Sequence, residues 1–267
     1  VWKPVSLLTD TVVIKISDKS GNSLMHRFAI TSTTNGFYFV DGAKGNNSNN
    51  GSEASPWKTM AYASATADSS AYVYVKKGKY SESGMPISAT NCGRFMAYPG
   101  DTVFVNSTSS GKSRIAINGG SKRLFQGFNF DGGGSRWFFM VQGYAKNLIW
   151  RNNIMHNNYS NDNENPSSIF FSNGSGNPIT GGNSYSNVVI QNNVFYDISG
   201  SGCGSVISFD VKNMLYEDNL AYDIGGTGVK DKDMGYMNTI RNNVIHDCID
   251  GIALTSQGGQ SGIEVNY

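Results

Sequence analysis

A short pattern built around an asparagine pair recurs along the chain and constrains the fold more than any other feature of the sequence. Its most regular copy is Asn187-Val-Val-Ile-Gln-Asn-Asn-Val-Phe-Tyr-Asp197. A recurring step of 20 to 50 residues is typical of one structural unit stacked many times, so the sequence predicts a solenoid. The seventh residue of each copy falls at steps of 25, 40, 26 and 24 residues, at Phe128, Asn153, Asn193, Asn219 and Asn243.

The residues between these copies are typical of short strands joined by turns. Apolar runs such as Arg94–Tyr98 and Trp137–Val141 alternate with segments rich in Gly, Asn and Ser. Only Pro56 opens a convincing helix, which argues against a doubly wound α/β architecture. We therefore expect an all-β fold, a parallel β-helix whose coils pair at a spacing of about 4.8 Å.

Strand alternation assigns each column of the repeat to one side of the strand. The asparagines of the pair lie between two inward columns, where the strand bends. Their stacked amides are predicted to satisfy one another and the backbone at the bend, which is a structural role. The inward columns are Trp150, Ile190, Tyr216 and Ile240, then Met155, Phe195, Ala221 and Ile245.

Residues 1–34 are predicted to form a separate N-terminal element. Two strand-like runs, Thr11–Ser17 and Leu24–Thr31, flank turn residues and predict a β-hairpin. Because two strands alone are marginal in water, we expect either the C-terminal strands of a truncated immunoglobulin-like sandwich or a hairpin packed on the main domain. A linker is expected at residues 31–36. The β-helix is predicted to cover residues 35–267 and to continue beyond the chain end.

The opening of the predicted solenoid has a specific order of elements. A strand leads through Asp41-Gly42 into a polar loop, then into a short helix with Ser55 as N-cap and Pro56 at its first position. Trp57, Met60, Ala61 and Ala65 give this helix an apolar face, and Ala71–Tyr80 follows as a strand. This order resembles secreted right-handed parallel β-helix proteins of the pectate-lyase-like polysaccharide lyase superfamily. The resemblance implies a right-handed β-helix with a capping helix, an extracellular location and a polysaccharide partner.

The outward columns of the repeat are candidates for binding that polysaccharide. Aromatic rings offer apolar faces to sugar C–H groups, while carboxylates and amides bind hydroxyls. The alternative is stacking between coils that only stabilises the solenoid. Arg151, Gln191, Glu217 and Arg241 form a polar column. The predicted substrate-binding residues are His156, Tyr196, Tyr222 and His246, with Asp197, Asp223 and Asp247 beside them.

One calcium-dependent branch of the superfamily carries Asp-Gly-Phe-x-x-Lys and, about 24 residues later, Asp-Asp-Gly-x-Asp. The matching segments here are 225–230 and 249–253. The resemblance implies calcium as a cofactor and Asp250 as its ligand. Gly225, Ile249 and Ala253 replace the other carboxylates, so the calcium site is expected to be absent or badly weakened.

A charged cluster near this position is the candidate catalytic site. Lys230 survives at the end of the first matching segment, followed by Asp231 and Asp233, with Asp210 one coil earlier. A desolvated lysine can act as a base. The alternative is a solvated turn with a local ion pair. In the calcium-dependent branch the catalytic lysine comes further along the chain, which corresponds to a position beyond residue 267 here.

These observations favour an extracellular carbohydrate-active protein that binds an acidic polysaccharide and cleaves it by β-elimination. A non-catalytic fibre or adhesin β-helix, able to self-associate, is the alternative from another class. A β-helix glycoside hydrolase using Asp210, Asp231 and Asp233 is a third. A net charge of +1 gives nucleic-acid binding no electrostatic basis, and no apolar run is long enough to span a membrane. The three cysteines, widely spaced, form no metal or redox motif and are expected to be buried.

Overall fold

The computed structural model describes residues 11–17, 19–21, 23–29, 36–82, 85–106, 113–161, 165–172, 185–232 and 235–255. The chain divides into two compact units, Val1–Gly36 and Phe37–Tyr267. In the first unit, β1 (Thr11–Ser17) and β2 (Ser23–Ala29) pair antiparallel, which confirms the predicted hairpin. An immunoglobulin-like domain stays a prediction, and the expected linker lies outside the described residues except for Gly36.

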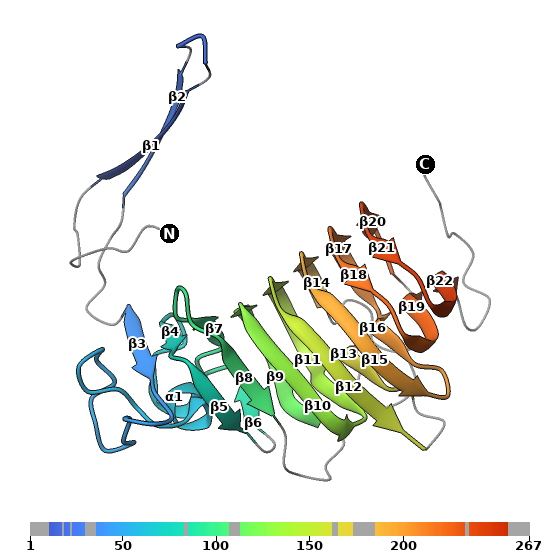
Figure 1. The fold of residues 1–267 in the computed structure, drawn as a ribbon, viewed down its shortest axis with the longest axis horizontal. Coiled ribbons are helices and arrows are strands. Elements are labelled where there is room, and N and C mark those ends of the chain that lie inside the picture. Colours follow the sequence, from blue (N-terminus) through green and yellow to red (C-terminus); the bar gives the residue numbers. More distant parts are fainter. Residues whose placement is uncertain are drawn as a thin grey trace. The chain divides into compact units, whose positions relative to one another are not determined.

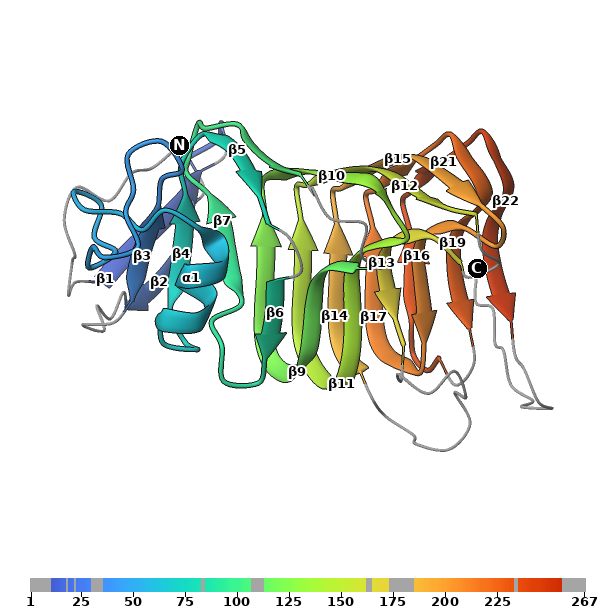
Figure 2. The same ribbon diagram turned by 90° about the horizontal axis from the view of Figure 1, so that it is seen from below.

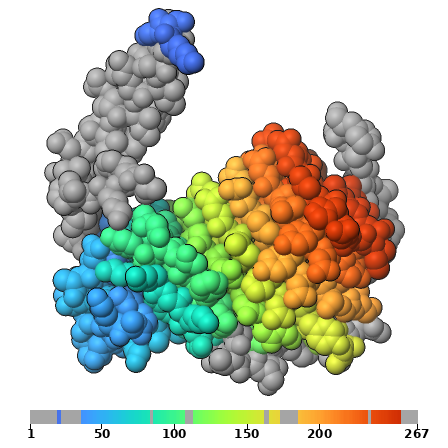
Figure 3. All heavy atoms as spheres, viewed as in Figure 1, coloured from blue at the N-terminus to red at the C-terminus, as the bar shows by residue number. Residues whose placement is uncertain are grey.

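In the second unit, strands β3 to β22 form one sheet in which every described pairing is parallel (Figures 1 and 2). The strands fall into three faces, because each strand pairs with the equivalent strand of the next coil. In Figure 3 the colours of this unit follow one another along the stack in the order of the sequence. This arrangement is a parallel β-helix.

The first face begins at β3 and ends at β20. It contains β3 (Phe37–Val40), β4 (Tyr72–Val75), β7 (Arg94–Ala97), the second halves of β9 (Ser113–Gln126) and β11 (Trp137–Arg151), β14 (Tyr185–Gln191), β17 (Val211–Glu217) and β20 (Thr239–Arg241).

The second face follows the first in each coil. It contains β5 (Gly78–Ser81), β8 (Val103–Asn106), β10 (Phe128–Ser135), β12 (Ile154–Ser160), β15 (Val194–Gly200), β18 (Leu220–Ala221) and β21 (Val244–Ile245).

The third face completes the coil. It contains β6 (Met85–Ser88), the first halves of β9 and β11, β13 (Ser167–Phe171), β16 (Gly204–Phe209), and most of β19 (Ile224–Lys232) and β22 (Cys248–Thr255).

The inward columns predicted from strand alternation form the core. Trp150, Ile190 and Tyr216 are fully buried and occupy paired positions of neighbouring coils. Ile240 and Ile245, in the last described coil, are partly buried and pack against the same cluster. Aromatic rings continue the column toward the N-terminus, since Phe125 stacks on Trp150 with ring centroids 6.1 Å apart. The predicted inward columns are confirmed.

The predicted asparagine ladder lies at the corner between the first and second faces. Asn193 accepts hydrogen bonds through Oδ1 from the backbone N–H and the side-chain amide of Asn153, both at 3.0 Å. Its own amide donates to the Trp150 carbonyl and to Asn219 Oδ1, and Asn219 repeats the pattern with Asn243. Three of these asparagines are at most 2% exposed. Each one therefore satisfies backbone groups that the turning chain leaves unpaired.

The corners also explain why Asn and Asp recur beside the ladder. Asn192 precedes the ladder residue with φ of 54°, in the left-handed region, where Asn and Asp are tolerated better than other residues with a Cβ. A second corner places Asn157, Asp197, Asp223 and Asp247 at φ between 51° and 60°. A third places Asn147, Asn187, Asn213 and Met237 at φ between 53° and 57°.

The helix begins later than the sequence predicted. α1 spans Met60–Thr66, and its N-cap is Thr59, whose side chain accepts a hydrogen bond from the Tyr62 N–H. The prediction of Ser55 as N-cap was wrong because residues up to Trp57 continue alongside β3, where Val40 and Trp57 form a parallel bridge. The buried side of the helix differs as well, since Ala61 and Ala65 are exposed, whereas the buried residues are Met60, Ala63 and Ser64.

α1 lies at the N-terminal end of the strand stack, where Ser64 Oγ donates a 2.7 Å hydrogen bond to the Cys92 carbonyl (Figure 2). Its role as a cap stays a prediction. The predicted strand at residues 71–80 is in fact two strands, β4 and β5, because the chain turns a corner at Lys76 and Lys77.

The oversized step of 40 residues between Asn153 and Asn193 keeps one strand on each face, namely β12, β13 and β14. Its extra residues lie in the connections 161–166 and 172–184, which are longer than 201–203 and the single residue 210 of the next coil. The extra length is therefore divided between the two ends of the third face. Most of its residues lie outside the described part of the chain.

Substituting Asn219→Ala should destabilise the fold by about 3 kcal/mol, since it leaves several buried donors and acceptors of three coils without partners. Asp218→Gly is the matched control, because Asp218 is the exposed left-handed neighbour at φ 54° and glycine adopts that conformation without strain. Urea unfolding measures both. Equal midpoints for the two variants would contradict a structural role for the ladder.

Met237→Asn should stabilise the fold by about 0.5–1 kcal/mol, since methionine at φ 54° is strained and its side chain is 67% exposed. The new amide would also lie next to Asn213, whose own amide donates to Asn187 Oδ1 at 3.3 Å. Thermal unfolding tests this. A variant that melts at or below the wild-type temperature would show that the left-handed conformation does not determine the preference for asparagine at this corner.

Candidate functional site

The predicted substrate-binding rings form one continuous stack on the second face. His156 and Tyr196 lie 4.8 Å apart with an interplanar angle of 6°, and Tyr222 and His246 continue the stack at 5.3 and 5.4 Å. Tyr196 and Tyr222 each have a ring on both sides, so their faces are covered and only their edges point outward. His156 and His246 are the end members of this row, and each has a ring neighbour in the row on one face. This geometry supports coil-to-coil stabilisation directly, whereas a sugar over the two tyrosines would meet hydroxyl edges rather than ring faces.

The carboxylates beside this stack lie at the exposed second corner. Asp197, Asp223 and Asp247 have the left-handed conformation described above, which by itself accounts for their residue type. Asp247 Oδ2 lies 2.8 Å from His246 Nδ1. The structure thus brings the rings and carboxylates together in one axial strip, and a glycan-binding role for this strip stays a prediction.

The predicted catalytic cluster separates into two groups, because successive residues of β19 point to opposite sides. Lys230 and Lys232 point outward from the third face, beside Ile207 and Phe209 of the preceding coil. Asp231 points the other way and accepts hydrogen bonds from Ser208 Oγ and Asn238 Nδ2, both at 2.8 Å. Asp231 therefore fills a corner of the fold and does not reach Lys230.

Asp210 also lies at a corner, between β16 and β17, with φ of 52° and a buried side chain. Burial raises the pKa of the Tyr185 hydroxyl, and the charge of Asp210 raises it further. Asp233 lies outside the described residues. Among the described members of the predicted cluster, only Lys230 lies on the outward side of the third face.

The Lys230 ammonium is held close to the surface of the β-helix. Nζ donates a 2.5 Å hydrogen bond to the carbonyl of Gly202, which lies in the turn that precedes β16. Gly202 has φ of 73°, and a Cβ there would come within 2.6 Å of Asn165 Oδ1, so glycine suits this position. Burial lowers the pKa of Lys230, and repulsion from Lys232 lowers it further.

A second apolar cluster lies outside the solenoid on this face, and the sequence analysis missed it. Trp137 stacks on Phe170 at 4.6 Å, and Phe170 contacts Phe209 edge to face at 5.8 Å. Ile207 belongs to the cluster and is 0% exposed although its position points outward. Lys232 Nζ lies 4.8 Å above the Phe209 ring. The two lysines therefore border a buried apolar cluster on β11, β13 and β16.

The signal for this cluster was present in the sequence as the run Trp137-Phe-Phe-Met-Val141. A strictly alternating strand would place Trp137 on the same side as Phe139. The ladder skips Phe138 between the pairs Trp137–Ser167 and Phe139–Ile169, and Phe138 joins the main core while Trp137 turns outward. An irregular strand start of this kind cannot be read from periodicity.

Asp250 is exposed on β22, and its Oδ2 accepts a 3.4 Å hydrogen bond from Thr227 Oγ1. Calcium takes six to eight oxygen ligands in proteins. Within the described ranges, no group of three or more His, Cys, Asp or Glu side chains is placed to hold a metal ion. The described residues around Asp250 therefore do not supply the ligand set of a calcium site, and calcium as a cofactor stays a prediction.

No protein-family model and no curated protein sequence matches this chain. Among solved structures, a GH136 lacto-N-biosidase from Eubacterium ramulus is similar at a TM-score of 0.48 and 12% identity, over 74% of this chain and 43% of that enzyme. A rhamnogalacturonan lyase is similar at a TM-score of 0.49 and 12% identity, over 83% of this chain and 67% of the lyase. The chain spans less than half of the lacto-N-biosidase. Neither similarity decides what this chain binds. No helix of the described residues is long and apolar enough to cross a membrane.

The partly buried carboxyl of Asp231 predicts a pH-dependent contribution to stability. Desolvation raises its pKa above 3.8, while the hydrogen bonds from Asn238 and Ser208 oppose the shift. The folded state therefore binds this proton more tightly than the unfolded state, so the contribution is present at low pH and is lost as pH rises through the raised pKa. Relative to Asp231→Asn, the wild type should gain stability as pH falls from neutrality toward 4. A pH-independent difference between the two unfolding free energies would contradict this account.

Proposed function

We propose that the third face binds an acidic polysaccharide, with Lys230 and Lys232 as the residues that receive its carboxylates. One observation carries the proposal. The two lysines occupy outward positions of one strand, with Cα atoms about 6.6 Å apart along it, and neither forms an ion pair with a carboxylate of the described residues. Two like charges that form no ion pair within the described residues favour an anionic ligand, since the charge of Asp250 acts on Lys230 only from beyond ion-pair distance.

The environment of Lys230 strengthens this argument. Half-burial and the neighbouring charge of Lys232 both disfavour its protonated form. A uronate carboxylate placed between the two lysines would reverse both effects, because an opposite charge stabilises each ammonium and removes their mutual repulsion. A polymer that runs along the solenoid would contact successive coils about every 4.8 Å. We therefore place its acidic residue at β19 and its neighbours over β16 and β22.

The same geometry supports cleavage by β-elimination. In such a step Lys232 holds the carboxylate, and the fraction of Lys230 that is unprotonated takes the proton from the sugar carbon next to that carboxylate. The electron pair of that C–H bond forms the new C=C bond, the glycosidic C–O bond breaks, and the leaving oxygen takes up a proton. Lys232 would stabilise the negative charge that develops on the carboxylate. An extracellular location, where acidic polysaccharides are found, belongs to this proposal.

Lys230→Met and Lys232→Met should each weaken binding of polygalacturonate or alginate about tenfold or more, since methionine keeps the apolar stem and removes the charge. Lys79→Met is the matched control, because Lys79 is exposed on β5 of the second face. Isothermal titration at low salt measures all three, and raising the salt should weaken wild-type binding. Binding that is absent in the wild type, or unchanged in both variants, would refute the site.

Cleavage has a separate readout. Incubating the wild type with the same polymers should produce the ultraviolet absorbance of unsaturated uronate ends, with a rate that rises as Lys230 loses its proton. Lys230→Met should abolish this signal. New reducing ends without that absorbance would assign hydrolysis instead, and binding without new ends would show a non-catalytic β-helix.

A further inference from the structure

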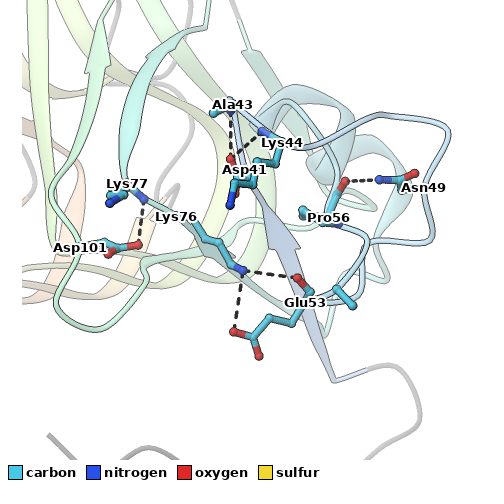
Figure 4. Close-up of a pocket in the computed structure, with 10 residues that line it drawn as sticks. Asp41, Ala43, Lys44, Asn49, Glu53, Pro56, Lys76, Lys77 and Asp101 are labelled. Atoms are coloured by element: carbon cyan, nitrogen blue, oxygen red, sulfur yellow. Dashed lines mark hydrogen bonds and ion pairs between the residues drawn. The ribbon is translucent and has the colours of Figure 1, made fainter.

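A hollow of about 460 Å³ lies at the N-terminal coils, formed by the polar loop after β3 and the corner after β4 (Figure 4). The corner contributes Lys76 and Lys77, and the turn before β8 contributes Asp101. The loop contributes Asp41, Lys44 and Glu53. The charged side chains that line the hollow thus comprise three carboxylates and three ammonium groups, and their formal charges cancel.

The carboxylates of the hollow are fixed by the backbone. Asp41 Oδ1 accepts hydrogen bonds from the N–H groups of Ala43 and Lys44, both at 3.0 Å. Asp101 Oδ2 accepts one from the Lys77 N–H at 2.9 Å. In each case the second carboxylate oxygen makes no hydrogen bond to the described residues. These two oxygens can therefore accept hydrogen bonds from a ligand, and binding would require little further loss of conformational entropy from the two side chains.

Phe39 and Tyr98, on the outer side of the first face, lie beside Lys76, which lines the hollow. Phe39 and Tyr74 stack at 5.7 Å, and Tyr98 is tilted against them at 55° and 75°. The Tyr98 hydroxyl donates a 2.7 Å hydrogen bond to Glu53 Oε1. Lys76 Nζ lies 5.5 Å above the Tyr98 ring and 3.8 Å from the Glu53 carboxylate (Figure 4 shows the pair of Lys76 and Glu53).

We propose that this hollow is a second carbohydrate site, which binds an uncharged sugar residue. A sugar hydroxyl donates to carboxylates and accepts from ammonium groups, so a hollow with balanced charges suits a neutral, hydroxyl-rich ligand. Partly exposed aromatic rings beside such groups suit the apolar face of a pyranose. For a uronate, electrostatic attraction to the lysines would be offset by repulsion from the carboxylates. The inference does not rest on the function proposed for the third face.

The test uses the full chain and four uncharged probes, the methyl glycosides of glucose, galactose, mannose and rhamnose, with galacturonate as the charged comparison. Saturation-transfer NMR and isothermal titration should show at least one neutral glycoside bound more tightly than galacturonate. Glu53→Gln and Tyr98→Ala should each raise its Kd about tenfold or more. Glu53→Gln keeps the size of the side chain, so a loss of binding there does not reflect misfolding.

Two control variants should leave the Kd unchanged. Tyr144→Ala removes an aromatic residue of β11 that is 73% exposed, and Lys230→Met removes the charge on the third face. The proposal is overturned if no neutral glycoside binds the wild type, or if binding survives both Glu53→Gln and Tyr98→Ala. It is also overturned if Lys230→Met abolishes the binding of neutral glycosides, because that would place the sugar on the third face.

Discussion

Parallel hydrogen bonding between consecutive coils is the interaction on which every other feature depends, and the buried asparagine column makes it compatible with a sharp corner. A strand that turns must leave backbone donors and acceptors without ladder partners. Asn153, Asn193 and Asn219 each satisfy such groups in two directions, toward the next coil and toward the preceding strand. The corner can then repeat without loss of register. Side chains at equivalent positions of successive coils therefore form rows along the axis of the β-helix.

Those rows determine which chemistry the surface can present. A row whose members are all aromatic forms a stack, as His156, Tyr196 and Tyr222 show. The faces of its rings then pack against neighbouring rings. A ligand can bind more readily where the residue type of a row differs between neighbouring coils, because such side chains do not stack on one another. On the third face Phe170 and Ile207 give way to Lys230 at equivalent positions, so the buried apolar cluster ends at an ammonium group. This change supports the proposal that the third face binds a ligand.

The sequence was sufficient to predict the parallel β-helix, the inward columns and the asparagine ladder, because each depends on a periodicity that the repeat displays directly. Alternation along β19 places Lys230 and Asp231 on opposite sides of the strand, whereas the predicted cluster rested on their proximity in the chain. The later start of α1, the outward turn of Trp137 and the hollow near Lys76 depend on irregular backbone and on residues distant in sequence. No local pattern encodes these three features.

The most direct test of the account is a crystal structure of the protein with an oligogalacturonate bound. The account predicts a uronate carboxylate within hydrogen-bonding distance of Lys230 Nζ, with the sugar chain running along the axis over β16, β19 and β22. A ligand lying instead along Tyr196 and Tyr222 on the second face, with Lys230 uncontacted, would contradict it.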